Sequence, residues 1–281
     1  MRTLSPGATG GSPTARYPAP VLKTSPLDGL RFAFGTLTVL PVRVHRWDRQ
    51  AARGGMLSAP VAGLVVGGCA AGLGLLLLFL GAGEPLAAVA SVAVPAALTR
   101  GLHLDGLADT ADGLGSGKPA EDALRIMKRS DIGPFGVITL VLVLTAQAAV
   151  LAQLYGDSWA RGAAAAVTSA VAARLALTWA ARTGVPAARP EGLGAAVAGV
   201  VPVPGALAVA AVCTLAAAAW GTAFGPHGAL RAAAAVPLSL AAAELLLRHC
   251  TRRFGGVTGD VFGALAETAA TTALVVLSLG R

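Results

Sequence analysis

The chain has 281 residues, of which 55% are hydrophobic and only 13% are charged, and its mean hydropathy is +0.69. This balance excludes an intrinsically disordered chain and a disulfide-stapled scaffold, and it favours a polytopic membrane protein whose partner is the lipid bilayer. The net charge of +8 does not indicate a nucleic-acid partner, because the basic residues lie between long apolar runs rather than along one stripe.

In chain order, residues 1–26 come first; they are rich in Gly, Pro, Ser and Thr and are predicted to form a disordered tail. Residues 28–44 form a shorter mixed segment, ended by Pro41, and predict an interfacial helix or a re-entrant element. Seven apolar stretches follow that are each long enough to cross a bilayer. They cover residues 57–80, 85–103, 132–154, 160–181, 205–224, 230–247 and 261–279. The sequence therefore predicts an all-α fold, a polytopic membrane helical bundle of about seven transmembrane helices, with residues 27–281 as a single integral-membrane domain.

The basic residues predict the orientation of this bundle. Eighteen of the 22 Lys and Arg residues fall in four segments that seven spans place on one face of the membrane. Because Lys and Arg are enriched in cytoplasmic loops, this face is predicted to be cytoplasmic, with the N-terminus inside and the C-terminus outside. The motifs described below open to the same face, where nucleotides are available.

The most informative motif is an acidic run that directly follows the second predicted span. It reads Gly101-Leu-His-Leu-Asp-Gly-Leu-Ala-Asp-Thr-Ala-Asp-Gly113. Asp105, Asp109 and Asp112 are spaced i, i+4 and i+7, which places them on one face of a helix. Carboxylates stacked so closely repel one another unless a cation lies among them, and oxygen ligands without a His or Cys cluster suit Mg²⁺ or Mn²⁺. The alternative is a solvated acidic face, which the neighbouring Leu, Ala and Gly residues disfavour.

Three charged residues lie within predicted spans or helices, where apolar surroundings make them costly. Arg174 lies in the fourth span and Glu267 in the last helix, where Asp260 at i−7 shares its face. Ionisable groups at membrane depth are functional candidates by default, with snorkelling as the alternative for Arg174. Glu244 interrupts the sixth span, and no partner for it is evident nearby in the sequence.

Two further segments carry groups suited to phosphate. The basic side chains of residues 125–136, Lys128 among them, either hold phosphates or act as positive-inside anchors, and the spacing favours neither. Ser130 stands just before the third span, where a helix N-terminus favours anions. The Gly- and Pro-rich loop 182–194 has two arginines and either covers a bound diphosphate or is a connector. His103 adjoins the acidic run, where a packed histidine is commoner than a ligand.

The acidic run resembles the signature of the adenosylcobinamide-GDP ribazoletransferase family, also called cobalamin synthase. Shorter matches occur in the family's order over residues 28–280. They are Leu40-Pro41-Val42, Arg53-Gly54 with Pro60 and Gly63, Ile126-Met127-Lys128 with Ser130 and Gly133, Arg174, Glu191-Gly-Leu-Gly194, and Gly259-Asp260 with Gly263 and Glu267. The resemblance implies a Mg²⁺-dependent enzyme, multi-pass in the bacterial cell membrane, that completes the lower loop of the corrinoid in vitamin B12 synthesis.

The resemblance also implies the substrates and the site residues. The substrates would be adenosylcobinamide-GDP and α-ribazole or its 5′-phosphate, and the products adenosylcobalamin or its phosphate and GMP. The metal ligands predicted on this basis are Asp105, Asp109, Asp112 and Glu267. The predicted catalytic residues are Asp112, Asp260 and Lys128, with a carboxylate as the base and the lysine on phosphate. The predicted substrate- or phosphate-binding residues are Arg174, Ser130, Gly192, Gly194 and His103.

Two other functions remain open from the residues alone. A membrane phosphotransferase that uses CDP-alcohols also needs acidic helix faces, but the D-x-x-D-G-x-x-A-R pattern of that class is absent. A cation transporter would place ionisable residues near the bilayer midplane on broken helices. The three aspartates lie past the end of a predicted span, which favours an enzyme at the membrane interface.

Overall fold

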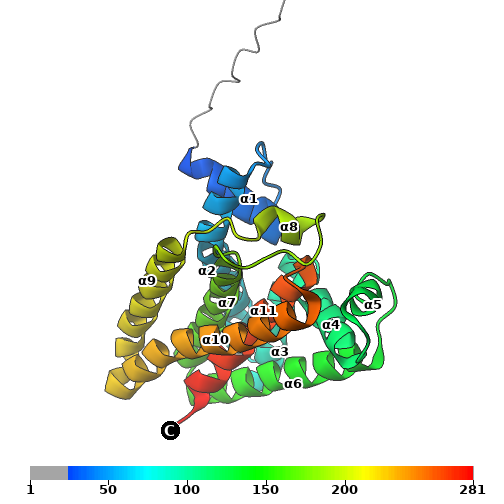
Figure 1. Cartoon of the computed structure of the whole chain (residues 1–281). Helices are drawn as coiled ribbons and strands as arrows, with labels where there is room; N and C mark the ends of the chain where they lie inside the picture. Colours follow the sequence, from blue (N-terminus) through cyan, green and yellow to red (C-terminus); the bar gives the residue numbers. More distant parts are fainter. Residues whose placement is uncertain (1–24, 281) are drawn as a thin grey trace, which may run out of the picture.

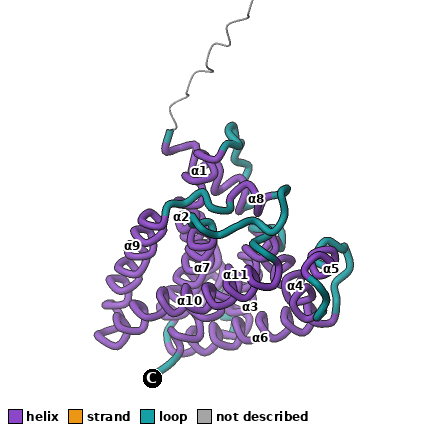
Figure 2. The backbone as a smooth tube through the Cα atoms, viewed as in Figure 1, coloured by secondary structure: helices purple, strands orange, loops and turns teal. Residues whose placement is uncertain are grey.

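The computed structural model describes residues 25–280, and within them every regular element is a helix (Figures 1 and 2). The all-α prediction is therefore confirmed. The predicted disordered tail 1–26 falls almost entirely outside the described residues. Two isolated bridges, Arg182–Val201 and Ala187–Val257, are the only β-type pairs in this part of the chain.

Six long helices form the body of the molecule and six short elements lie around them. The long helices are α2 (Arg49–Phe79), α6 (Pro134–Asp157), α7 (Trp159–Ala180), α9 (Val203–Gly221), α10 (Gly225–Phe254) and α11 (Gly259–Ser278). The short elements are α1 (Pro26–Leu37), α3 (Glu84–Leu98), α4 (Leu102–Gly115), α5 (Ala120–Ile126), α8 (Leu193–Val197) and the 3₁₀ turn η1 (Thr222–Phe224). Helix α7 lies inside the bundle, where α2, α6, α10 and α11 all pack against it (Figure 1).

Small residues bring α2 and α7 into close contact. A side chain at Gly63 would meet the backbone oxygen of Ala170 at 2.5 Å, and one at Gly67 would meet the Cα of Val167 at 2.8 Å. Close approach of backbones through small residues is the usual way in which helices associate in a membrane, where burial of apolar surface gives little preference for protein over lipid. The Gly63-xxx-Gly67 spacing thus explains why the alanine-rich α7 packs along α2.

The predicted count of seven spans is not confirmed. Five helical stretches are long and apolar enough to cross a membrane, or six if a bent pair counts as one span. That pair is α3 and α4, which meet at 88° because Arg100 and Gly101 both have positive φ, at 54° and 70°. The predicted span 85–103 therefore ends at this bend. The predicted fifth and sixth spans lie in one helical stretch, Val203–Phe254, which η1 interrupts.

The segment predicted as an interfacial or re-entrant element begins with the helix α1. Its N-terminus has a capping box, in which the Asp28 carboxylate accepts the backbone N–H of Ser25 at 3.2 Å. Helix α1 packs against α2 at the end of the bundle that also carries α8, uppermost in Figure 1, and the C-terminus marks the opposite end. Beneath α8, the long loop between α7 and α9 crosses the start of α11 (Figure 2). This crossing closes the candidate site.

Candidate active site

The acidic run and the start of α11 meet where two helices touch at glycines. A side chain at Gly106 of α4 would meet the backbone oxygen of Asp260 at 2.6 Å, and one at Gly263 of α11 would meet the backbone oxygen of His103 at 2.9 Å. Only glycine allows this approach, so Gly106 inside the acidic motif serves helix packing. The contact sets the Asp260 carboxylate beside those of α4.

Three carboxylates form the acidic group: Asp105 and Asp109 of α4 and Asp260 of α11. Asp109 is close enough to Asp105 and Asp260 for their negative charges to repel one another. The Arg189 guanidinium lies 3.9 Å from the Asp260 carboxylate and offsets part of this charge. Within residues 25–280, no three His, Cys, Asp or Glu side chains converge closely enough to form a group that could hold a metal. The carboxylates of the acidic group are oxygen donors of the kind that Mg²⁺ prefers.

A cavity of about 280 Å³ opens beside the acidic group; we call it the site cavity. Its polar lining includes Asp105, Asp260, Arg189, His103 and Thr258, together with the loop glycines Gly192 and Gly194. Its apolar lining includes Leu37, Met56, Leu177, Val197 and Phe262, which are all buried. Segments from α1, α2, α4, α7, α8 and α11 thus meet at one cavity. Five residues predicted from the sequence line it: Asp105, Asp260, His103, Gly192 and Gly194.

Asp112 has a different environment from the other two aspartates of the run. Its side chain is buried, and its two carboxylate oxygens accept backbone N–H groups of Gly133 at 2.7 Å and Gly136 at 2.9 Å. These N–H groups belong to the first turn of α6, which has no intrahelical partners for them. Asp112 therefore caps α6 from another helix. Its predicted roles as metal ligand and base stay predictions, and both of its oxygens are already engaged.

Removing this cap should destabilise the fold. Asp112→Ala leaves the backbone N–H groups of the part-buried Gly133 and the buried Gly136 without acceptors, and we expect the free energy of unfolding to fall by about 3 kcal/mol. Thermal unfolding in detergent measures the change. Asp105→Ala is the matched control on the same helix, because Asp105 is exposed. Equal melting temperatures for the two variants would show that the cap contributes nothing.

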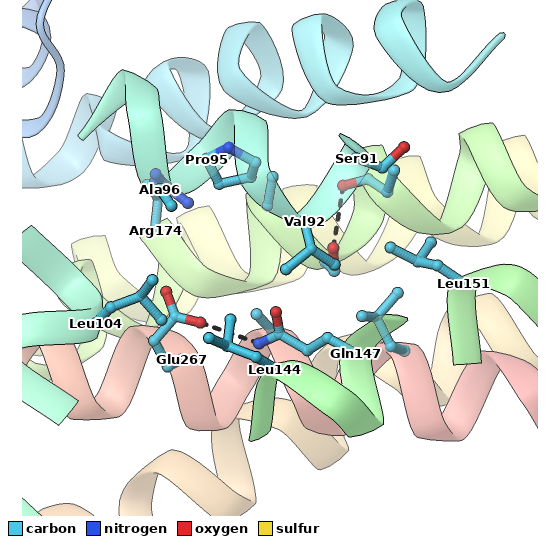
Figure 3. A pocket seen from close by; sticks show the side chains of 15 residues that line it. Ser91, Val92, Pro95, Ala96, Leu104, Leu144, Gln147, Leu151, Arg174 and Glu267 are labelled. Atoms are coloured by element: carbon cyan, nitrogen blue, oxygen red, sulfur yellow. Dashed lines mark hydrogen bonds between the residues drawn. The ribbon is translucent and has the colours of Figure 1, made fainter. Parts of the chain in front are cut away.

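Arg174 and Glu267 line a second, smaller cavity of about 40 Å³ together with Gln147, Ser91 and Ser169; we call it the polar chamber. Gln147 donates a hydrogen bond to Glu267 at 3.0 Å, and Arg174, which belongs to α7, lies on the opposite side of the chamber (Figure 3). Arg174 is only 2% exposed, and its Nε and Nη2 atoms have no hydrogen-bond partner. The structure thus places both residues away from the lining of the site cavity. Their predicted roles on phosphate and metal stay predictions.

The basic segment lies outside the site cavity as well. Lys128 and Ser130 are exposed in the loop between α5 and α6, and neither contributes to the lining of the site cavity. The Asp112 contact with Gly133 fastens this loop to α4 only a few residues away. Any phosphate that Lys128 binds would therefore lie outside the lining of the site cavity.

Sequence reasoning left Glu244 without a partner and left Arg189 out of the site. Glu244 accepts hydrogen bonds from Trp179 at 2.9 Å, Arg182 at 2.8 Å and Arg248 at 2.7 Å, so it ties α10 to the end of α7. Arg189 also donates to the backbone oxygen of Leu124, which links the loop to α5. A charged side chain in a Gly- and Pro-rich loop was the one signal that pointed to Arg189.

Comparison with known proteins identifies the family of the chain. The family model for cobalamin-5-phosphate synthase matches residues 29–278. An adenosylcobinamide-GDP ribazoletransferase of Frankia casuarinae is 42% identical over 263 residues, which cover 89% of this chain and 94% of that protein. One of Nocardioides sp. is 40% identical over 255 residues, covering 88% and 97%, and one of Bradyrhizobium diazoefficiens is 39% identical over 261 residues, covering 88% and 92%. No solved structure matches. The matched region contains every residue of the acidic group and the lining of the site cavity, and the chain belongs to the cobalamin-5-phosphate synthase family, transferases of a late step in cobalamin biosynthesis.

Proposed function

We propose that this protein joins adenosylcobinamide-GDP to α-ribazole or α-ribazole 5′-phosphate and releases GMP, with Mg²⁺ held by Asp105 and Asp109 together with the diphosphate of the substrate. The observation that carries the proposal is the juxtaposition of Asp105, Asp109 and Asp260 with Arg189 at the mouth of a cavity. Mg²⁺ usually binds through one or two carboxylates plus substrate phosphates, so an incomplete set of protein ligands suits a diphosphate substrate. Mn²⁺ has the same ligand preference and is the expected substitute.

In the proposed reaction, a ribose hydroxyl oxygen of the acceptor forms a bond to the phosphorus next to cobinamide, and the bond from that phosphorus to the oxygen of GMP breaks. The Thr258 hydroxyl donates to Oδ2 of Asp260 at 3.1 Å and orients this carboxylate, which leaves Oδ1 to accept the hydroxyl proton. Asp105 and Asp109 would hold the cation, which neutralises charge that develops on the phosphoryl oxygens. Arg189 adds positive charge at the same place.

We further propose that the site faces the cytoplasm of a bacterial cell, where the nucleotide substrate is available. The support is the concentration of Lys and Arg in the segments at and near the site. A cysteine placed at Gly117, in the exposed loop after α4, should react with an impermeant thiol reagent only from the cytoplasmic side. Reaction from the outside would contradict the orientation.

The reaction itself is tested with the purified full chain in bilayer vesicles. Adenosylcobinamide-GDP, α-ribazole and Mg²⁺ should give GMP and a corrinoid product in equal amounts, and EDTA should abolish both. The same assay with α-ribazole 5′-phosphate identifies the preferred acceptor. Cation flux across the vesicles without GMP release would instead support a transporter.

A further inference from the structure

We propose that the site cavity holds the base of the acceptor nucleoside, so that the apolar part of ribazole is buried between α2, α7 and α11 while its sugar faces the acidic group. The inference rests on the proposed function and assigns one part of one substrate to one part of the site. It follows from the size of the cavity, from the polarity of its lining and from the position of the carboxylates at its mouth.

Size decides which part of the two substrates fits. The site cavity measures about 280 Å³, near the lower end of the range of pockets that enclose small ligands. A corrinoid macrocycle with its amide side chains is several times too large to be enclosed. The parts that fit are the three nucleoside units: guanosine and the adenosyl group on the donor, and ribazole on the acceptor.

Polarity distinguishes these nucleosides. Most of the buried lining residues are apolar, such as Met56, Leu177 and Phe262, and the buried polar ones are His103 and Thr258, each 4% exposed. Guanine and adenine carry several hydrogen-bond donors and acceptors, more than two side chains can pair, and each group left unpaired against such a surface costs about 1–3 kcal/mol. The base of ribazole, dimethylbenzimidazole, has no hydrogen-bond donor once it is attached to ribose. The lining therefore favours the acceptor base.

The rest of the lining sets the direction of the nucleoside. The charged lining residues are more exposed than the apolar ones: Asp105 is exposed, and Asp260 and Arg189 are half-buried. With the base among the apolar residues, the ribose hydroxyls point toward Asp260, the residue proposed to take the proton. The cation and the diphosphate then lie outside the cavity beside Asp105, where the large corrinoid does not have to be enclosed.

The test fills the cavity and compares acceptors of different size. Ala195 of α8 lines the cavity, and Ala196, its neighbour on the same helix, is exposed and does not. The measured quantity is the ratio of kcat/KM for α-ribazole to kcat/KM for the riboside of unsubstituted benzimidazole. Ala195→Leu should lower this ratio at least tenfold, because the two ring methyl groups lose their space, and Ala196→Leu should leave it unchanged. A ratio does not respond to the fraction of folded protein.

A second variant enlarges the cavity. Here the measured quantity is the ratio of kcat/KM for a wider acceptor, a naphthalene-fused imidazole riboside, to kcat/KM for α-ribazole. Met56→Ala should raise this ratio about tenfold, because the shorter side chain leaves room for the larger base. If both variants retain the wild-type ratios, or if Ala196→Leu shifts them equally, the base binds elsewhere and the inference is wrong. In that case the wild-type protein still releases GMP. If the wild-type protein releases no GMP with either acceptor, the proposed function has failed instead. Should Ala195→Leu be inactive, equilibrium binding of α-ribazole alone decides: unchanged affinity overturns the inference.

Discussion

Asp109→Asn should lower turnover about a thousandfold while the protein still inserts and folds. Asp109 occupies the middle of the acidic group, half-buried and within electrostatic reach of both Asp105 and Asp260. The substitution keeps the size of the side chain and removes its charge, so the loss falls on the cation that stabilises the transition state. A contribution of ~4 kcal/mol from that cation corresponds to the thousandfold change. GMP release at saturating substrate measures it.

Two further observations separate this effect from general damage. Raising Mg²⁺ should recover part of the activity of Asp109→Asn, because weaker binding of the cation is the main defect. Glu121→Gln is the control, since Glu121 is highly exposed on α5 and pairs with the exposed Arg125, and its activity should stay at the wild-type level. Full GMP release by an inserted Asp109→Asn protein would mean that the acidic run is a solvated face.

Glu267→Gln should lower the free energy of unfolding by about 3–5 kcal/mol. This is the largest effect on stability that we expect from an isosteric substitution in this protein. Arg174 is 2% exposed and lines the polar chamber together with Glu267, the acidic side chain whose charge acts on it there, although no direct ion pair joins the two. Removing the negative charge opposite a buried arginine leaves that arginine uncompensated in a medium of low polarity. Denaturation in mild detergent measures the loss.

The double variant Arg174→Met with Glu267→Gln should regain most of that stability, because a buried pair replaced on both sides leaves no isolated charge. Thr271→Ser is a conservative control on the same helix, and it keeps the hydroxyl to which Gln147 also donates. If Arg174 instead binds substrate phosphate, Arg174→Met alone would abolish activity without altering stability, and the double variant would be no more stable than Glu267→Gln. The two roles of Arg174 thus give opposite patterns.

Periodicity and composition predicted the helical fold and most of the long helices correctly, because the need to satisfy backbone polar groups in lipid leaves few alternatives. The number of spans is not confirmed where local backbone geometry matters. Arg100 adopts positive φ in the structure, and no pattern of apolar residues indicates a bend of 88° inside an apolar run. Hydropathy predicted two spans over residues 205–247, and the structure has two helices there, α9 and α10, joined through η1 in one helical stretch.

The sequence allowed several residues of the site to be predicted, but it gave less information about the contacts and role of each one. Helical spacing placed Asp105, Asp109 and Asp112 on one face, yet tertiary contacts decide what each carboxylate touches. Asp112 meets the start of α6, a helix that lies beyond a loop in the sequence, and spacing within α4 contains no information about it. The same holds for Glu244, whose three donors come from α7, its adjoining loop and α10. Charged groups that pair across helices cannot be assigned until the helices are packed.

The burial of α7 inside the bundle has a consequence for the insertion of the chain into the membrane during synthesis. Helix α7 carries Arg174 in its C-terminal half and is mostly buried by its neighbours, whereas α6 is more apolar and mostly faces outward. Only Ser158 separates the two helices. An arginine at the centre of a lone span opposes its release into lipid by about 3 kcal/mol, so α7 is a poor candidate to leave the translocon alone. Because the turn between the two helices is one residue long, we expect α7 to enter the bilayer together with α6, as the second arm of a helical hairpin. The final position of α7 then depends on helices that are synthesised later, above all α11.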